Sequence, residues 1–220
     1  MWTRTETTSI EVPPHILHWD ITSNDFVHKL IIRLFTNRTT DDFTNTWNKK
    51  VRCSYCLSSI DKTLRVRSFD NVKKHLDFFL SAKVPQVKFI DRTFNADREH
   101  ALSVWTYLKD HDNGVTNFHF EIAADLLTKE EIDVIRAMRP GLIQLEIGVQ
   151  STNAETLTAI RRHADIKKIR SAVSALRKAG NVHIHLDLIA GLPFEDRASF
   201  LRSFNEVFSM QPNELQLGFL

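Results

Sequence analysis

Apolar and polar residues alternate one by one in several separate segments of this sequence, and this pattern limits the possible folds more than any other feature. The segments that alternate cover residues 118–122, 142–149, 182–190 and 214–220, and a further strand is expected at 87–91. In residues 118–122, for example, three apolar residues alternate with His119 and Glu121. Because successive side chains of a strand point to opposite faces, each alternating segment predicts a strand with one apolar and one polar face.

Helical patterns separate these segments. Apolar residues recur at helical spacing in three stretches, namely Val72, Leu76, Phe79 and Leu80; Leu102, Trp105 and Leu108; and Ile169, Val173 and Leu176. Thr128 with Glu131 and Thr152 with Glu155 fit capping boxes, and Gly180 fits the residue that ends a helix. Strands that alternate with helices in this way predict βαβ units and a mainly parallel sheet.

The polar strand faces are unusual for such a sheet, because a parallel sheet normally buries both faces. Burying an unpaired polar group costs about 1–3 kcal/mol. The polar face should therefore line a wet or ligand-filled space, with the helices on the apolar face. We expect an α/β barrel or an open half-barrel that carries its chemistry at the carboxyl ends of the strands. An open sheet with one solvated face is the alternative.

Charge and targeting signals narrow the possible partners. The sum of 29 basic and 27 acidic residues is +2, which gives no electrostatic reason to expect a nucleic acid or an acidic membrane as partner. No apolar run approaches the ~20 residues that cross a bilayer, and the first residues contain no apolar export signal. We therefore expect a cytoplasmic location, where Cys53 and Cys56 stay thiols unless a metal or a redox partner binds them.

Composition changes near residue 50. Residues 1–50 contain no glycine and no alanine, but they hold ten threonines against eight in the rest of the chain. Only residues 28–35 resemble a packed element there. We therefore divide the chain into an atypical polar segment, 1–50, and a core, 51–220. The first segment is either a polar arm or a stretch read out of frame.

The residues that follow the predicted strands form a recognisable set. In chain order the sequence contains CSYC, VKFIDRTFN, FHFEIAADLL, QLEIGVQSTN and HLDLIAGLPFE. This ordered set resembles the radical S-adenosylmethionine (SAM) superfamily, and most of all the branch whose full-length members also carry a cobalamin-binding domain. The resemblance covers 53–220. It implies a partial (βα)6 TIM-like barrel, incomplete at both ends, that holds a 4Fe-4S cluster and SAM.

The resemblance also implies an activity. In the family, the cluster reductively cleaves SAM to a 5′-deoxyadenosyl radical, which takes a hydrogen from the substrate; here the substrate is unknown, and flavodoxin or ferredoxin is the expected electron donor. Cobalamin is a possible further cofactor of full-length relatives. By the same resemblance, Cys53 and Cys56 match the second and third cluster ligands. Tyr55 matches an aromatic residue beside the adenine.

Five further positions match family residues that contact SAM. The resemblance assigns Glu121 to SAM itself, Gln150 and Asp187 to the ribose hydroxyls, Arg162 to the SAM carboxylate and Gly191 to the turn beside the adenine. Arg161 is the neighbouring alternative to Arg162.

The match fails at the first cluster ligand. The family spacing C-x3-C-x2-C places that cysteine at position 49, where this sequence has Lys49, and there is no third cysteine. An ammonium group has no lone pair to offer iron. The alternative function is therefore a non-catalytic remnant that keeps the barrel without a complete cluster.

Simpler interpretations remain for some residues. A lone C-x2-C is also typical of a redox pair or half of a zinc site. His183 and His185 share a face with Asp187 and could be metal ligands or hydrogen-bonded lumen residues. The helical spacing of Phe200, Phe204 and Phe208, like Trp105, predicts core positions.

Overall fold

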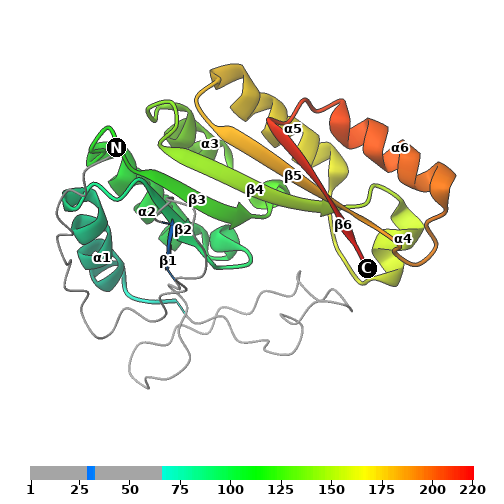
Figure 1. The fold of residues 1–220 in the computed structure, drawn as a ribbon, viewed down its shortest axis with the longest axis horizontal. Helices are drawn as coiled ribbons and strands as arrows, with labels where there is room; N and C mark the ends of the chain where they lie inside the picture. The colour runs from blue at the N-terminus through cyan, green and yellow to red at the C-terminus, as the bar shows by residue number, and fades with distance from the viewer. Residues whose placement is uncertain (1–28, 33–65) are drawn as a thin grey trace, which may run out of the picture.

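The computed structural model describes residues 29–32 and 66–220, in which six strands form one sheet. The strands are β1 (Lys29–Ile32), β2 (Gln86–Phe89), β3 (Asn117–Ile122), β4 (Ile143–Gln150), β5 (His183–Ala190) and β6 (Glu214–Phe219). They pair in sequence order, and each neighbouring pair is parallel. Within the described ranges β1 and β6 are the two edges, so the sheet is an open part of a barrel (Figure 1).

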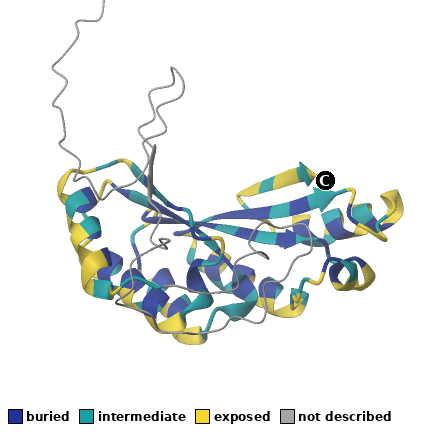
Figure 2. Cartoon of the chain, turned by 90° about the horizontal axis from the view of Figure 1, so that it is seen from below, coloured by how far each residue is buried: buried dark blue, intermediate teal, exposed yellow. Residues whose placement is uncertain are grey.

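The helices lie on one side of this sheet (Figure 2). They are α1 (Phe69–Ser81), α2 (Arg98–Asp110), α3 (Lys129–Arg136), α4 (Ala154–Ala159), α5 (Ile166–Ala179) and α6 (Arg197–Phe208), with short 3-10 turns η2 (Phe94–Ala96) and η3 (Ala124–Leu126). The predicted α/β class, the parallel sheet and the five strand positions are confirmed, and β1 falls inside the one early segment expected to be structured.

Two of the three helix-end predictions are confirmed. Thr128 and Glu131 form a capping box at α3, and Gly180 ends α5 in the left-handed conformation with φ of 70°. The third prediction is wrong, because Asn153 rather than Thr152 caps α4 and accepts from the backbone nitrogen of Glu155. The Thr152 hydroxyl instead donates to Ser203, 3.2 Å away.

The core lies between the helices and the apolar strand faces. An aromatic group at its centre joins β2, η2, α2 and β3: the Phe89 and Phe120 rings stack at 4.4 Å between centroids, and Trp105 packs edge-on to Phe120 at 6.0 Å. Apolar contacts of this kind give most of the stabilisation of the domain. The core position predicted for Trp105 is therefore confirmed.

The core position predicted for Phe208 is wrong. Phe200 and Phe204 pack partly buried against the core, but Phe208 is 62% exposed and stacks on Phe204 at the end of α6. Helical spacing alone could not show that α6 turns its last apolar residue away from the sheet. None of the helices in 66–220 is long and apolar enough to cross a membrane.

Candidate functional site

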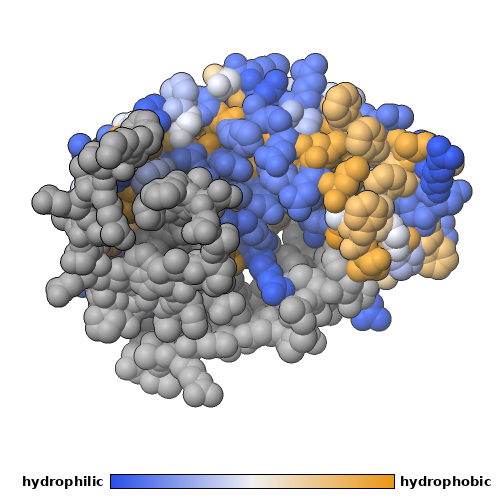
Figure 3. Space-filling view, in the orientation of Figure 1, coloured by the Kyte–Doolittle hydropathy of each residue, from blue (hydrophilic) through white to orange (hydrophobic). Residues whose placement is uncertain are grey.

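The polar residues of the strands share the face of the sheet opposite the helices. Across neighbouring strands the register places Lys88 beside His119, Glu121 beside Glu146, Glu146 beside His185, Gly148 beside Asp187, and His185 beside Glu214. Hydrophilic residues accordingly gather in the middle of the face shown in Figure 3. The predicted two-faced strands are thus confirmed, and their polar sides form one continuous surface.

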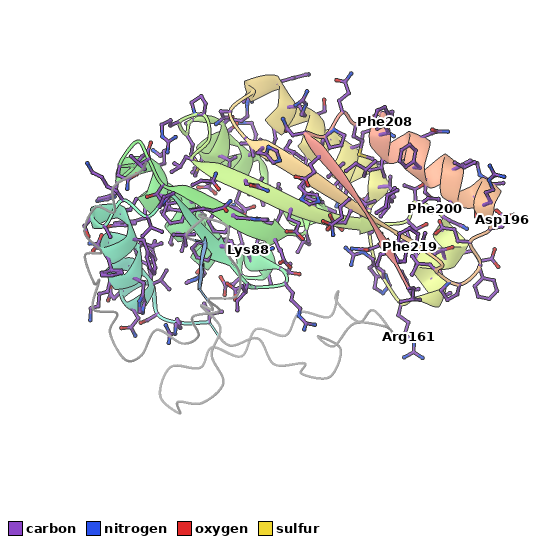
Figure 4. The ribbon with its side chains drawn as sticks, in the orientation of Figure 1. Lys88, Arg161, Asp196, Phe200, Phe208 and Phe219 are labelled. Atoms are coloured by element: carbon purple, nitrogen blue, oxygen red, sulfur yellow. The ribbon has the colours of Figure 1, made fainter. Side chains whose placement is uncertain are left out.

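Ion pairs link the polar side chains in the middle of this surface. Lys88 Nζ, on β2 (Figure 4), lies 3.3 Å from Glu121 Oε1 and 3.1 Å from Glu146 Oε2. His119 Nε2 lies 2.9 Å from the same Glu146 oxygen. The bond from His119 lowers the pKa of Glu146 to about 2, against the opposing effect of burial and with the help of Lys88. Burial lowers the pKa of Lys88, but the two carboxylates outweigh it and raise that pKa.

Asp187 lies on β5, two residues after His185 and therefore closer to the carboxyl ends of the strands. Burial raises the pKa of Asp187 to about 6, against the attraction of His185, whose Nε2 lies 3.0 Å from Oδ1. The carboxylates of Glu146 and Glu121 act in the same direction as burial. This carboxyl group can therefore accept a proton near neutral pH, which most aspartates do not.

Gln150 ends β4 in an unusual conformation. Its φ is 73°, and its amide nitrogen occupies the space that a Cβ on Gly148 would need. Arg162, from the segment after α4, donates from Nη2 to the Gly148 carbonyl oxygen. Gly148 therefore allows the Gln150 amide and the Arg162 guanidinium to approach the same strand position. Arg161 is exposed and points away from the sheet (Figure 4).

Gln150 and Asp187 therefore lie close to each other, since the Gln150 amide folds over Gly148 and Gly148 is the register partner of Asp187. Glu121 lies on β3, and its register partner on β4 is Glu146, two residues before Gly148. Its carboxylate pairs with Lys88. Four of the five predicted SAM contacts thus come from adjoining positions near the carboxyl ends of the central strands. They are Glu121, Gln150, Arg162 and Asp187.

The fifth predicted contact, Gly191, follows β5 directly. Its φ is 91°, a conformation that favours glycine, and a Cβ there would lie 3.6 Å from the Leu220 carbonyl oxygen. The turn that begins at Gly191 therefore starts next to the end of β6.

The cluster-loop predictions cannot be placed in this arrangement. Cys53, Tyr55, Cys56 and the position of Lys49 lie outside the described residues. Within 66–220, no group of three or more histidines, cysteines and acidic residues is arranged to hold a metal ion. His183 and His185 instead lie 3.6 Å and 3.8 Å from Glu214, which favours the lumen interpretation over a metal site.

Sequence reasoning did not find the residues that join the strand-end loops. Asn95, nearly buried after β2, exchanges two 2.9 Å hydrogen bonds with the backbone of Ala123 after β3. Ser151 after β4 donates to Glu195 after β5 at 2.6 Å. Both Asn95 and Ser151 stand in the strings that carry the family resemblance, and their polarity beside strand ends was the available signal.

A parallel sheet in sequence order, helices on one side and polar groups at the carboxyl ends of the strands together define an open α/β-barrel domain. The model of the Radical SAM superfamily matches residues 50–207. The chain belongs to this superfamily, whose members use a 4Fe-4S cluster and SAM.

Relatives in sequence cover a smaller stretch. The oxygen-independent coproporphyrinogen III oxidase of Salmonella typhimurium is 32% identical over 107 residues, 46% of this chain and 23% of that protein. The oxygen-independent coproporphyrinogen-III oxidase-like protein HemZ of Bacillus subtilis is 32% identical over 91 residues, 41% of this chain and 18% of its own length. This chain thus spans less than a quarter of these two relatives.

Solved structures are similar over a larger share of this chain. The radical SAM methyltransferase TsrM from Kitasatospora setae, with cobalamin and a 4Fe-4S cluster bound, superposes with a TM-score of 0.67 at 14% identity, covering 80% of this chain and 35% of that chain. Coproporphyrinogen III oxidase HemN from Escherichia coli gives a TM-score of 0.53 at 20% identity, covering 71% and 39%. At these identities the similarity establishes the fold.

Proposed function

We propose that this chain is the SAM-binding core of a radical SAM enzyme, with SAM held at the carboxyl ends of β3, β4 and β5. The observation that supports this most is the convergence at Gly148, where the Gln150 amide and the Arg162 guanidinium come together and whose register partner on β5 is Asp187. Residues of these types suit an adenosyl amino acid, because an amide and a carboxylate accept hydrogen bonds from ribose hydroxyls and a guanidinium pairs with a carboxylate.

The described residues fit SAM. The Oε1 atom of Gln150 is buried and has no hydrogen-bond partner within the described part of the chain. A buried acceptor of this kind costs free energy unless a donor reaches it, and a ribose hydroxyl is such a donor. Glu121, Arg162 and Gly191 are proposed to complete the site as the family resemblance assigns them, with Tyr55 on the cluster loop.

The cysteine set does not fit a complete cluster. The sequence holds two cysteines, Cys53 and Cys56, whereas the family arrangement uses three thiolates, and Lys49 stands at the first of the three positions. When bound, a 4Fe-4S cluster supplies the electron that cleaves SAM. Family membership therefore implies reductive cleavage of SAM to a 5′-deoxyadenosyl radical that acts on an unknown substrate. The two cysteines that are present do not by themselves support this reaction.

A non-catalytic remnant that binds SAM without building the cluster is the second candidate, and Lys49 is the observation that favours it. The two candidates differ in iron content. Anaerobic reconstitution with iron and sulfide, followed by iron counting and a visible spectrum, should give about four irons per chain with broad absorbance for the enzyme. Colourless protein identifies the remnant.

A restoring variant sharpens this experiment. Lys49→Cys recreates the C-x3-C-x2-C spacing, and Cys53→Ser removes a ligand as the matched control. If the chain is a remnant of a cluster protein, Lys49→Cys should gain iron and colour under conditions that leave the unchanged protein pale. A Lys49→Cys variant that binds no more iron than Cys53→Ser would contradict the alignment of this loop with the family motif.

Further assignments also stay proposals. The family match begins at residue 50, close to the composition change, which supports a division into 1–50 and a radical SAM core, 51–220. Cobalamin is proposed as a cofactor of longer relatives in view of the TsrM structure, and flavodoxin or ferredoxin as the electron donor if the cluster forms.

A further inference from the structure

A buried polar cluster joins three elements directly beyond Gln150. Ser151 Oγ donates to Glu195 Oε1 at 2.6 Å, and Ser203 Oγ donates to the same oxygen at 3.3 Å. The residues belong to the loop after β4, the loop after β5 and helix α6. Ser151 is 0% exposed and Ser203 is 1% exposed, so both hydroxyl groups are removed from water, and Glu195 is half-buried. Bonds to an ionised acceptor are about twice as strong as neutral ones.

The backbone on each side of this cluster is strained. Gln150 precedes Ser151 and has φ of 73°, and Phe194 precedes Glu195 and has φ of 60°. Residues other than glycine adopt this conformation at a cost in free energy, and they keep it only where the surroundings fix it. The Ser151–Glu195 bond lies directly between the two strained positions. Asn153 adds a second link by donating to the Phe194 carbonyl oxygen at 3.0 Å.

The strained conformation of Gln150 is what brings its amide over Gly148. In a regular extended strand the Gln150 side chain would share the face of Gly148 but lie about 7 Å further along the strand. The positive φ and the register shift after Gly148 fold it back instead. The cluster therefore fixes a side chain that it does not touch.

We propose that Glu195 is a positioning residue of the SAM site: by binding Ser151 and Ser203 it holds Gln150 in the conformation that presents its amide to SAM. This inference rests on the proposed function. Glu195 itself is not assigned to contact SAM. The same bond also ties the turn that begins at Gly191 to the end of β4.

Calorimetric titration of the full chain with SAM tests the proposal. Glu195→Ala should weaken SAM binding about tenfold, the effect expected when one well-placed hydrogen bond is lost. Glu195→Gln keeps an acceptor oxygen and should restore most of the affinity. Glu206→Ala is the matched control, because Glu206 lies on α6 and pairs with Arg170 at the surface; its SAM affinity should not change.

A double substitution separates positioning from general stability. If Glu195 acts through the Gln150 side chain, Glu195→Ala should cause less than about a twofold further loss in a Gln150→Ala background. Equal losses in both backgrounds would overturn the positioning role. Should Glu195→Ala not fold, Ser151→Ala is the second variant, and it should weaken binding in the same Gln150-dependent way.

The outcomes distinguish the positioning role of Glu195 from the proposed binding of SAM by the chain. Unchanged protein that binds SAM, together with a Glu195→Ala variant of equal affinity, would overturn the positioning role alone. Unchanged protein that binds no SAM would overturn the proposed function and this role with it.

Discussion

At the scale of single residues, Asp187 shows how burial sets the chemistry of the site. Its carboxyl group faces His185 on its own strand, Glu146 and Glu121 on β4 and β3, and Lys88 on β2. Burial raises its pKa to about 6, so its charge changes near neutral pH. A ribose hydroxyl donates more strongly to a carboxylate than to a neutral carboxyl group. SAM affinity should therefore depend on the protonation of this residue.

The first prediction concerns pH. Since Asp187 is deprotonated above its pKa of about 6, SAM should bind more tightly at pH 7 than at pH 5, by at most about tenfold per pH unit for one linked proton. The α-amino and α-carboxyl groups of SAM titrate outside this window. Calorimetry across this pH range measures the effect, and Asp187→Asn should bind weakly without the pH step. A similar step in Asp187→Asn would contradict the assignment.

The second prediction concerns Gly148. A Cβ there would take the position of the Gln150 amide nitrogen, so Gly148→Ala should displace that side chain and weaken SAM binding about tenfold. Gly218→Ala is the matched control, because its Cβ would meet its neighbours at ordinary distances of 3.6 Å and 3.7 Å. Equal SAM affinity in the two variants would show that Gln150 is not where the account places it.

At the scale of elements, the sequence predicted five of the six described strands and three of the helices because their signals are local. Alternation marks a strand, helical spacing marks a helix face, and Gly180 marks the end of α5. The choice of Asn153 over Thr152 as cap was not predictable, since it depends on Ser203, which belongs to a distant helix. The exposure of Phe208 depends in the same way on the orientation of α6.

The third prediction concerns the link between two strand-end loops. Asn95→Ala removes both hydrogen bonds to Ala123 and leaves two partly buried backbone groups without their partner. The free energy of unfolding should fall by about 2 kcal/mol, as urea denaturation measures. Ser103→Ala removes an exposed bond to the backbone of Glu99 and should change stability by less than about 0.5 kcal/mol. A loss at Asn95 no larger than at Ser103 would contradict the structural role.

At the scale of the whole molecule, the sheet separates a helix-covered apolar side from a polar side. The residues of the candidate site could be named from the sequence through the family resemblance, but their contacts could not. The fold-back of Gln150, the contact of Arg162 with the Gly148 carbonyl and the Ser151–Glu195 bond depend on the strand register and the strained backbone, which a sequence pattern does not encode.

The fourth prediction follows from the apolar surface over α6 and β6, at the right of Figure 3. Phe219 on the edge strand β6 is 85% exposed and Leu217 beside it is 41% exposed. Edge strands with apolar side chains tend to pair with other chains, so this chain should associate as its concentration rises. Phe219→Lys should reduce association in sedimentation velocity experiments, whereas Val115→Lys should not. A monomeric unchanged protein would contradict this prediction.

Binding of SAM to the anaerobically prepared full chain, measured by equilibrium dialysis with labelled SAM, tests the central claim most directly. We expect one class of saturable site whose affinity falls at least about tenfold in Asp187→Ala and in Gln150→Ala. Absence of saturable binding, or affinity that neither substitution changes, would contradict it.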